Sequence, residues 1–147
     1  MARQAPDQGL IAEDLVARLG LAPHPEGGWY RETWRADCHV DSRSRGTAIL
    51  YLLEARGRSH WHTVDADELW LWHAGAPLAL LTAPCDDGPI ERRLLDALAP
   101  QGLVPAGHWQ AAEAGEGWAL VSCIVVPGFD FAGFTLAPPG WAPAGGG

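Results

Sequence analysis

Positive charge is scarce in this sequence of 147 residues. Lys and Arg together number 10 against 18 Asp and Glu, which gives a formal net charge of −8, and the basic residues form no cluster. Binding to a phosphate backbone needs concentrated positive charge, so nucleic acid is excluded as an expected partner.

Long hydrophobic runs are absent as well. No apolar stretch approaches the roughly 20 residues that a transmembrane helix needs, and the segment MARQAPDQ has no hydrophobic core of the signal-peptide type. We therefore expect no membrane partner and a cytoplasmic location.

Cysteine is rare. The three cysteines, Cys38, Cys85 and Cys123, are widely spaced and include no C-x-x-C pair, which excludes a recognised zinc ribbon and a disulfide framework. Cys123 lies in the apolar segment ALVSCIVV, so we interpret it as a small buried side chain rather than a nucleophile.

The sequence does contain enough apolar residues for one packed domain, since 48% of its residues are hydrophobic and its length suits a single core. Near the start, Leu10, Ile11, Leu15 and Leu19 recur at helical spacing, with Gly20 directly after them. This pattern predicts a short amphipathic helix.

The rest of the chain reads as short strands rich in Trp, Tyr, Val, Ile and Thr, separated by Gly, Pro and Asp. The predicted strands cover residues 29–35, 47–53, 59–63, 69–73, 77–83, 90–94, 108–112, 118–124 and 134–136. Many short strands with frequent turns predict an all-β sandwich or barrel rather than alternating β and α units.

The segment SHWHTVDADELWLWHAG contains the most informative polar residues. Side chains alternate across a strand, so His60 and His62 are expected to share one face. A tight antiparallel return after VDAD would bring Glu68 close to both histidines. Two histidines and a carboxylate could hold a divalent metal, or could transfer protons as a base supported by a carboxylate.

Four blocks in this order carry a resemblance to a known family: PHPEGGWYRETWR, WHTVDADELWLWHAGAPLALL, LVPAGHWQA and VVPGFDFAGFTLA. They resemble the small cupin family of largely unknown function that is often called cupin family five, within the RmlC-like cupins. The resemblance implies a double-stranded β-helix, or jelly-roll barrel, over residues 1–137, a pocket in the barrel mouth and a homodimer. Residues 138–147, rich in Pro and Gly, are expected to form a flexible tail.

The resemblance leaves the use of a metal open. Metal-binding cupins place a third histidine three residues after the glycine of a Pro-x-Gly motif, where this sequence has Gln110. The ligand set would then be His60, His62, Glu68 and Gln110, binding Fe, Ni, Mn or Zn, although an amide is a weaker ligand than imidazole. If no cofactor is required, His62 is the expected general base, with Glu68 orienting it.

The block PEGGWYRETWR supplies further candidates. The family motif favours Tyr30 as a proton donor and Arg31 and Glu32 as substrate-binding residues, while an edge strand that discourages aggregation is the alternative. Trp70 and Trp72 are interpreted either as barrel filling or as a stacking wall for a ligand.

Three functions therefore remain open from the sequence. The first is an isomerase or epimerase that acts on a small polar substrate, sugar-derived or carbonyl-containing, with His62, Glu68 and Tyr30 as catalytic residues. The second is a metal-dependent, oxygenase-like cupin enzyme. The third is a protein that binds a small-molecule ligand without catalysis.

Overall fold

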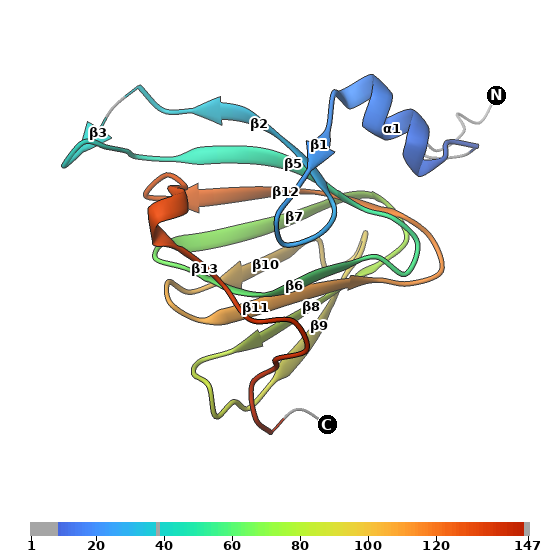
Figure 1. Cartoon of the computed structure of the whole chain (residues 1–147). Coiled ribbons are helices and arrows are strands. Elements are labelled where there is room, and N and C mark those ends of the chain that lie inside the picture. The colour runs from blue at the N-terminus through green and yellow to red at the C-terminus, as the bar shows by residue number, and fades with distance from the viewer. Residues whose placement is uncertain (1–8, 38, 146–147) are drawn as a thin grey trace.

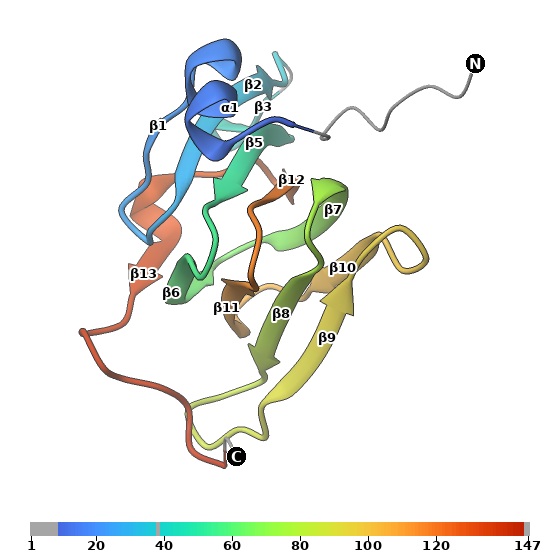
Figure 2. The ribbon, with the colours of Figure 1, turned by 90° about the vertical axis from the view of Figure 1, so that its right-hand side faces the viewer.

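The chain folds into two facing antiparallel sheets, and the computed structural model describes residues 9–37 and 39–145. The first sheet contains, in spatial order, β1 (Ala22–Pro23), β2 (Trp29–Arg35), β5 (Thr47–Leu53), β12 (Ala119–Val126), β7 (Asp67–Gly75) and β10 (Gln101–Val104). The second contains β13 (Phe134–Leu136), β6 (Arg58–Val64), β11 (Trp109–Ala114), β8 (Leu78–Ala83) and β9 (Glu91–Leu95). Figures 1 and 2 show these sheets as the two walls of a barrel. The predicted all-β jelly roll is confirmed.

Two small elements complete the fold. A hairpin joins β3 (His39–Val40) to β4 (Arg43–Ser44), and a short 3-10 helix, η1 (Phe131–Gly133), precedes β13. Asp130 caps η1 by accepting a hydrogen bond from the main-chain N–H of Ala132, as its position in a Gly-rich turn suggests.

The predicted helix is present as α1 (Ala12–Leu19), which ends at Gly20 in the left-handed conformation. Leu15 is buried against Leu21 and Leu52, so the apolar face of the helix covers one end of the first sheet. In Figure 2, α1 lies in front of β2 and β5, nearer the viewer.

The core lies between the sheets, where side chains from both of them interdigitate. It contains Tyr51, Leu53, Trp70, Leu78, Leu80, Leu95, Val104 and Val121, each no more than 1% exposed. Cys123 is also buried there, as its apolar segment predicted. The interior is therefore packed at this depth, and any binding space must lie nearer the barrel ends.

The sequence did not predict β10, because its segment QGLV is flanked by prolines and contains Gly102. The glycine has a packing reason: a Cβ atom at this position would lie 2.9 Å from a methyl carbon of Leu80 and 3.2 Å from one of Leu95. A strand can approach the core so closely here because residue 102 has no side chain.

The last described residues pack against the outer face of the second sheet. The ring of Trp141 lies 4.4 Å from that of Trp109, and the main-chain N–H of Ala144 donates to the Asp86 oxygen over 2.8 Å. Packing thus continues past the expected domain boundary at residue 137. Within residues 9–37 and 39–145, no helix is long and apolar enough to cross a membrane.

Candidate active site

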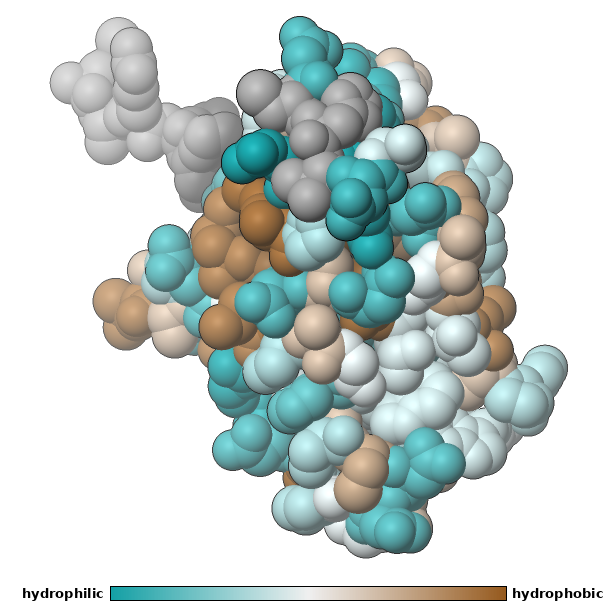
Figure 3. All heavy atoms as spheres, turned by 90° about the vertical axis from the view of Figure 1, so that its left-hand side faces the viewer, coloured by the Kyte–Doolittle hydropathy of each residue, from teal (hydrophilic) through white to brown (hydrophobic). Residues whose placement is uncertain are grey.

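A cavity of about 440 Å³ opens at the barrel end that contains η1, on the left of Figure 1. Four of its polar lining residues are almost completely buried: His24, Glu26, His62 and Glu68 are 9%, 8%, 1% and 6% exposed. The phenylalanines of residues 129–134 form an apolar wall beside them. Figure 3 views the molecule from this side and shows a mostly hydrophilic surface, with hydrophobic residues gathered at the upper left.

His62 and Glu26 form a buried ion pair in this cavity. His62 Nε2 lies 2.9 Å from Glu26 Oε2, and His62 Nδ1 lies 2.7 Å from the main-chain oxygen of His60. A carbonyl oxygen and a carboxylate only accept hydrogen bonds, so both ring nitrogens carry protons. Burial disfavours the charged ring, but the charge and hydrogen bond of Glu26, the charge of Glu68 and the hydrogen bond to His60 together outweigh burial and raise the pKa of His62 to about 9. His62 is therefore an imidazolium at neutral pH.

Glu26 is ionised for the complementary reason. Burial alone would raise the pKa of its carboxyl, but the charge of His62 and hydrogen bonds from His62 and Ser59 lower the pKa below its ordinary value. The turn that delivers Glu26 depends on Gly27, which has a φ of 106° and whose Cβ, if present, would lie 2.3 Å from the oxygen of Arg58. Only glycine allows the turn to approach β6 so closely.

Glu68 enters the same cavity from the opposite sheet. Its Oε1 accepts a hydrogen bond of 2.9 Å from Gln110 Nε2, and Gln110 Oε1 accepts one of 2.8 Å from Trp70 Nε1. The thiol of Cys123 also hydrogen-bonds the carboxyl. Burial is the main cause that raises the pKa of Glu68, to about 7: together with the negative charge of Glu26, it exceeds the lowering by the charge of His62 and by these hydrogen bonds. Glu68 can therefore gain or lose a proton near neutral pH.

His24 is the neutral histidine of the site. Burial lowers the pKa of its ring more than Glu26 raises it. The main-chain N–H of Glu26 donates to His24 Nδ1 over 3.1 Å, so the neutral ring carries its proton on Nε2. Glu26 Oε1 also lies 3.3 Å from Nδ1, but this contact is an ion pair only if the ring is charged, which the lowered pKa of His24 opposes.

The cavity mouth is formed by β2 and the loop before β13. Arg35 donates to Glu32 Oε1 over 2.6 Å and to the main-chain oxygen of Phe129 over 3.1 Å, which ties the loop to the strand. Tyr30 lies further inside, with its ring 4.5 Å from the ring of His24 in an edge-to-face arrangement. Tyr30 and Glu32, two of the candidate residues of this strand, thus line the cavity together with Arg35.

The structure does not place His60 and His62 on one face of β6. The pairing of β6 with β11 shifts register between Gln110 and Ala112, so β6 contains a bulge that reverses the alternation of its side chains. Ser59 and His62 consequently both reach Glu26, whereas His60 Nε2 contacts the main-chain oxygen of Pro138 at 2.9 Å on the outer face. The expectation of a shared face was wrong because it assumed a regular strand.

His62 and Glu68 do meet, but not through a hairpin. Strand β6 belongs to the second sheet and β7 to the first, so the turn at residues 65–66 is a corner between sheets. Each of the two side chains faces the interior from its own sheet, and each shifts the pKa of the other. The hydrogen-bond partner of His62 is Glu26 rather than Glu68.

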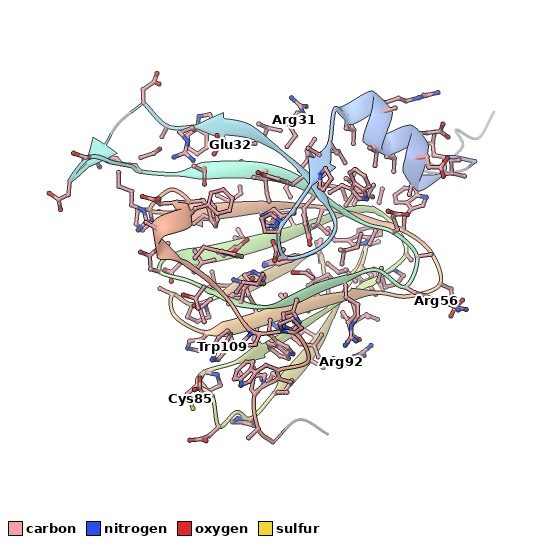
Figure 4. All side chains as sticks on the ribbon, viewed as in Figure 1. Arg31, Glu32, Arg56, Cys85, Arg92 and Trp109 are labelled. Atoms are coloured by element: carbon pink, nitrogen blue, oxygen red, sulfur yellow. The ribbon has the colours of Figure 1, made fainter. Side chains whose placement is uncertain are left out.

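Three further predicted site residues lie outside the cavity lining. Trp70 is 1% exposed and packs edge-to-face on Tyr51 in the core, and Trp72 donates to the Ala76 oxygen over 2.9 Å. Arg31 donates to the Leu19 oxygen at the end of α1, and Figure 4 shows it on the outer side of β2. The two tryptophans therefore fill the barrel, and Arg31 holds the helix.

The four side chains predicted to bind a metal are not arranged as a metal site. His60 lies on the outer face, both nitrogens of His62 already donate, and Gln110 Oε1 already accepts from Trp70. A divalent metal needs several free electron pairs converging on one point. In the part of the chain that the structure describes, no three His, Cys, Asp or Glu side chains are placed to hold a metal ion.

Sequence reasoning missed Glu26, His24 and Arg35 as members of the site. A signal was available, because PHPEGG begins the same block that pointed to Tyr30 and contains two ionisable residues beside a pair of glycines. A loop has no periodicity, so its spacing alone could not show that the two side chains turn inward.

The comparison with protein families agrees with this architecture. Residues 13–137 match the family described as Cupin superfamily (DUF985), which is most of the chain. The chain belongs to this cupin family. Metal-binding cupins have a histidine at the position of Gln110. In this chain, the Gln110 side chain donates a hydrogen bond to Glu68.

Solved structures show the same fold. A hypothetical protein from Leishmania major is 34% identical, with a TM-score of 0.80 over 87% of this chain and 88% of that one. A protein from Shewanella oneidensis is 36% identical, with a TM-score of 0.79 over 87% of this chain and 85% of that one. Oxalate decarboxylase from Bacillus subtilis is only 14% identical, with a TM-score of 0.61 over 78% of this chain and 29% of that one, so it shares the fold alone. A comparison with curated proteins found no match.

Proposed function

We propose that this cupin is an isomerase or epimerase that moves a proton on a small polar carbonyl compound bound in the cavity. The observation that carries the proposal is the pair of buried carboxyls beside one imidazolium. Glu26 is held ionised, while the pKa of Glu68 is raised to about 7. Two carboxyls whose pKa values are pushed apart in one cavity are typical of acid–base catalysis, and a base works best when its pKa is near the working pH.

In this mechanism Glu68, rather than His62, is the proton acceptor. His62 already carries two protons, both donated to fixed partners, and so has no free electron pair with which to act as a base. Glu68 as carboxylate removes a proton from the carbon next to the carbonyl. The electrons of the C–H bond form a C=C bond, and the π electrons of the carbonyl move to its oxygen. Tyr30 then supplies a proton to the opposite face of the same carbon, which restores the carbonyl and inverts the configuration, and solvent takes the proton from Glu68 and returns one to Tyr30.

His62 and Tyr30 have supporting roles in the proposal. The imidazolium holds Glu26 and keeps a positive charge near Glu68, which favours the carboxylate form that removes the proton. Tyr30 lines the cavity and carries a hydroxyl group that can protonate the enolate, as the family motif favoured. Neither role requires a metal ligand.

Exchange of substrate hydrogen with solvent deuterium tests the proposal. Small ketoses, aldoses and keto acids would be incubated with the protein in D₂O, and loss of the C–H signal next to the carbonyl followed by NMR. We expect exchange with at least one compound, and a decrease of about 100-fold or more in the Glu68→Gln variant. Glu113→Gln is the matched control, because Glu113 pairs with Arg58 away from the cavity. Exchange that survives in Glu68→Gln contradicts the proposal.

A protein that only binds its ligand is the second candidate. The observation in its favour is the apolar wall of Phe129, Phe131 and Phe134, whose rings lie within 5.9 Å of one another and could cover a bound molecule. This candidate is supported if a compound binds and is recovered without deuterium. It also predicts that the only effect of Glu68→Gln is a change in the affinity for that compound.

We also propose that the protein forms a homodimer through β2. Strand β1 pairs only with Trp29 and Tyr30, which leaves the outer edge of β2 open over the rest of its described length, and Trp34 is 52% exposed there. An open strand edge with an exposed tryptophan favours association. The mass from light scattering at micromolar concentration tests this, and a monomer mass contradicts it.

A further inference from the structure

Both cationic groups of the cavity already have anionic partners. His62 is paired with Glu26, and Arg35 lies 2.6 Å from Glu32 and also donates to the Phe129 oxygen. No other Lys, Arg or protonated His lines the cavity among the described residues. A phosphate or carboxylate on a ligand would therefore find no free cation there.

Acidic groups outnumber these cations. Glu26, Glu32, Glu68 and Asp130 line the cavity against the two cations, and Glu26 and Glu68 are more than nine-tenths buried. An anionic ligand would have to be desolvated beside these carboxyls, which is unfavourable because like charges repel strongly where water is excluded. The charges of the cavity thus disfavour anions.

A neutral hydrogen-bond donor remains free in the same cavity. The proton of His24 is on Nε2, on the side of the ring opposite the Nδ1 atom that faces Glu26. Within the described residues, His24 Nε2 has no hydrogen-bond partner, and the ring touches that of Tyr30. An uncharged N–H group in the cavity can donate to a carbonyl oxygen without adding a charge that would attract anions.

We propose that the cavity selects an uncharged carbonyl compound and that His24 Nε2–H donates a hydrogen bond to its carbonyl oxygen. The inference rests on the proposed function for the reaction, but it concerns which molecule is bound. During that reaction the C–H proton moves to Glu68 and the π electrons of the carbonyl move to its oxygen. The hydrogen bond from His24 then stabilises the enolate oxygen, and His24 keeps its proton throughout.

Matched ligands test the selection for an uncharged carbonyl. The probes are uncharged ketoses and aldoses of about three to six carbons, which suit the cavity volume, each compared with its phosphate ester and with the alditol that lacks the carbonyl. By calorimetry we expect at least one carbonyl compound to bind with a Kd of about 10 mM or tighter. Its phosphate ester should bind about 100-fold or more weakly, and its alditol about threefold to tenfold more weakly.

Two substitutions of His24 separate its donor from its bulk. His24→Gln retains an N–H group near the position of Nε2, whereas His24→Leu removes the donor and keeps an apolar side chain. We expect His24→Leu to weaken binding of the carbonyl compound about threefold to tenfold and to leave the affinity for the alditol unchanged, while His24→Gln stays near the unmodified protein. His60→Leu, on the outer face, is the control and should change neither affinity.

The outcomes distinguish this inference from the proposed function. Binding that depends on His24, without deuterium exchange, supports the inference and contradicts the enzymatic proposal. Exchange on a phosphate ester or a keto acid in preference to uncharged compounds supports the enzyme and overturns the inference. The inference is also overturned if no uncharged carbonyl compound binds, or if His24→Leu binds it as tightly as His24→Gln does.

Discussion

Strand β6 separates two hollows of equal volume and opposite character. The cavity inside the barrel and a groove on the outer face of the second sheet each measure about 440 Å³. His62 lines the cavity, and His60, two positions earlier on β6, lines the groove. Each hollow also contains a carboxylate that is paired with a cation. The pairs are Glu26 with His62 inside and Glu113 with Arg58 outside.

The two ion pairs differ in their contact with water. Side chains of the inner pair are 2% and 8% exposed, and those of the outer pair are 72% and 35% exposed. Water screens the outer charges, so their attraction contributes little to stability. Inside, each charge is stable only because the other is present, and burial in the same cavity raises the pKa of Glu68 to about 7. An ion pair of a carboxylate with a cation thus shifts pKa values strongly only where its side chains are buried.

The largest expected effect is the loss of the inner carboxylate. Glu26→Gln leaves His62 buried without a counter-charge, and we expect the free energy of unfolding to fall by about 3 to 5 kcal/mol at neutral pH. Glu113→Gln should lower it by less than about 1 kcal/mol. Urea denaturation of both variants measures the difference. Equal losses would show that the inner pair is screened like the outer one.

The second effect is a pH dependence of stability that the outer groove lacks. The pKa of His62 is raised from 6.5 to about 9, so its contribution is complete below pH 6.5 and is lost as the pH rises through 9. The pKa of Glu68 is raised from 4.5 to about 7, so its contribution is lost as the pH rises through 7. For each group the change corresponds to about 3 kcal/mol.

We therefore expect the free energy of unfolding to fall from about pH 4.5, where the Glu68 contribution begins to be lost, to about pH 9, where the His62 contribution has been lost. In Glu68→Gln the part of the fall between about pH 4.5 and pH 7 should disappear, while the part between about pH 6.5 and pH 9, which is due to His62, remains. His60→Gln should reproduce the full curve, because His60 lies outside the cavity. Urea denaturation at each pH checks both, and a flat curve for the unmodified protein would contradict the buried charges.

The contrast between the two histidines also shows what the sequence could predict. Most of the longer strands follow from local patterns and are present in the structure, although β10 was missed, and Glu68 lies in the same cavity as His62. The bulge in β6 could not be predicted, because the extra residue is defined by how β6 pairs with β11, nearly 50 residues later.

The partner of His62 was missed for a related reason. Glu26 reaches the cavity through a turn whose path is fixed by the close approach of Gly27 to β6, a contact between segments distant in sequence. A pattern of strands contains no information about which loop folds inward. Local rules thus predicted the barrel but not the charge that gives His62 its raised pKa.

A smaller difference in stability is expected between variants of Trp70 and Trp109, which both donate a hydrogen bond to a side chain. Trp70→Phe leaves the oxygen of Gln110 unpaired in the core and loosens its hold on Glu68, so we expect a loss of about 2 kcal/mol. Trp109→Phe removes an exposed hydrogen bond to Asp86 and should cost less than about 1 kcal/mol; Figure 4 shows Trp109 on the lower side of the barrel. Thermal unfolding compares the two, and an equal loss would mean that the Gln110 contact is dispensable.

The smallest change in stability is expected for His60→Gln, because His60 lies outside the cavity that contains His62. The variant retains a donor for the Pro138 oxygen, so its free energy of unfolding should stay within about 0.5 kcal/mol of the original, and deuterium exchange should be unchanged. His62→Gln, two positions further along the same strand, should lose the ion pair with Glu26 and most of the exchange. If His60→Gln abolished exchange while the protein remained folded, His60 would have to contact the reacting molecule. That result would contradict the bulge in β6, which places His60 on the outer face.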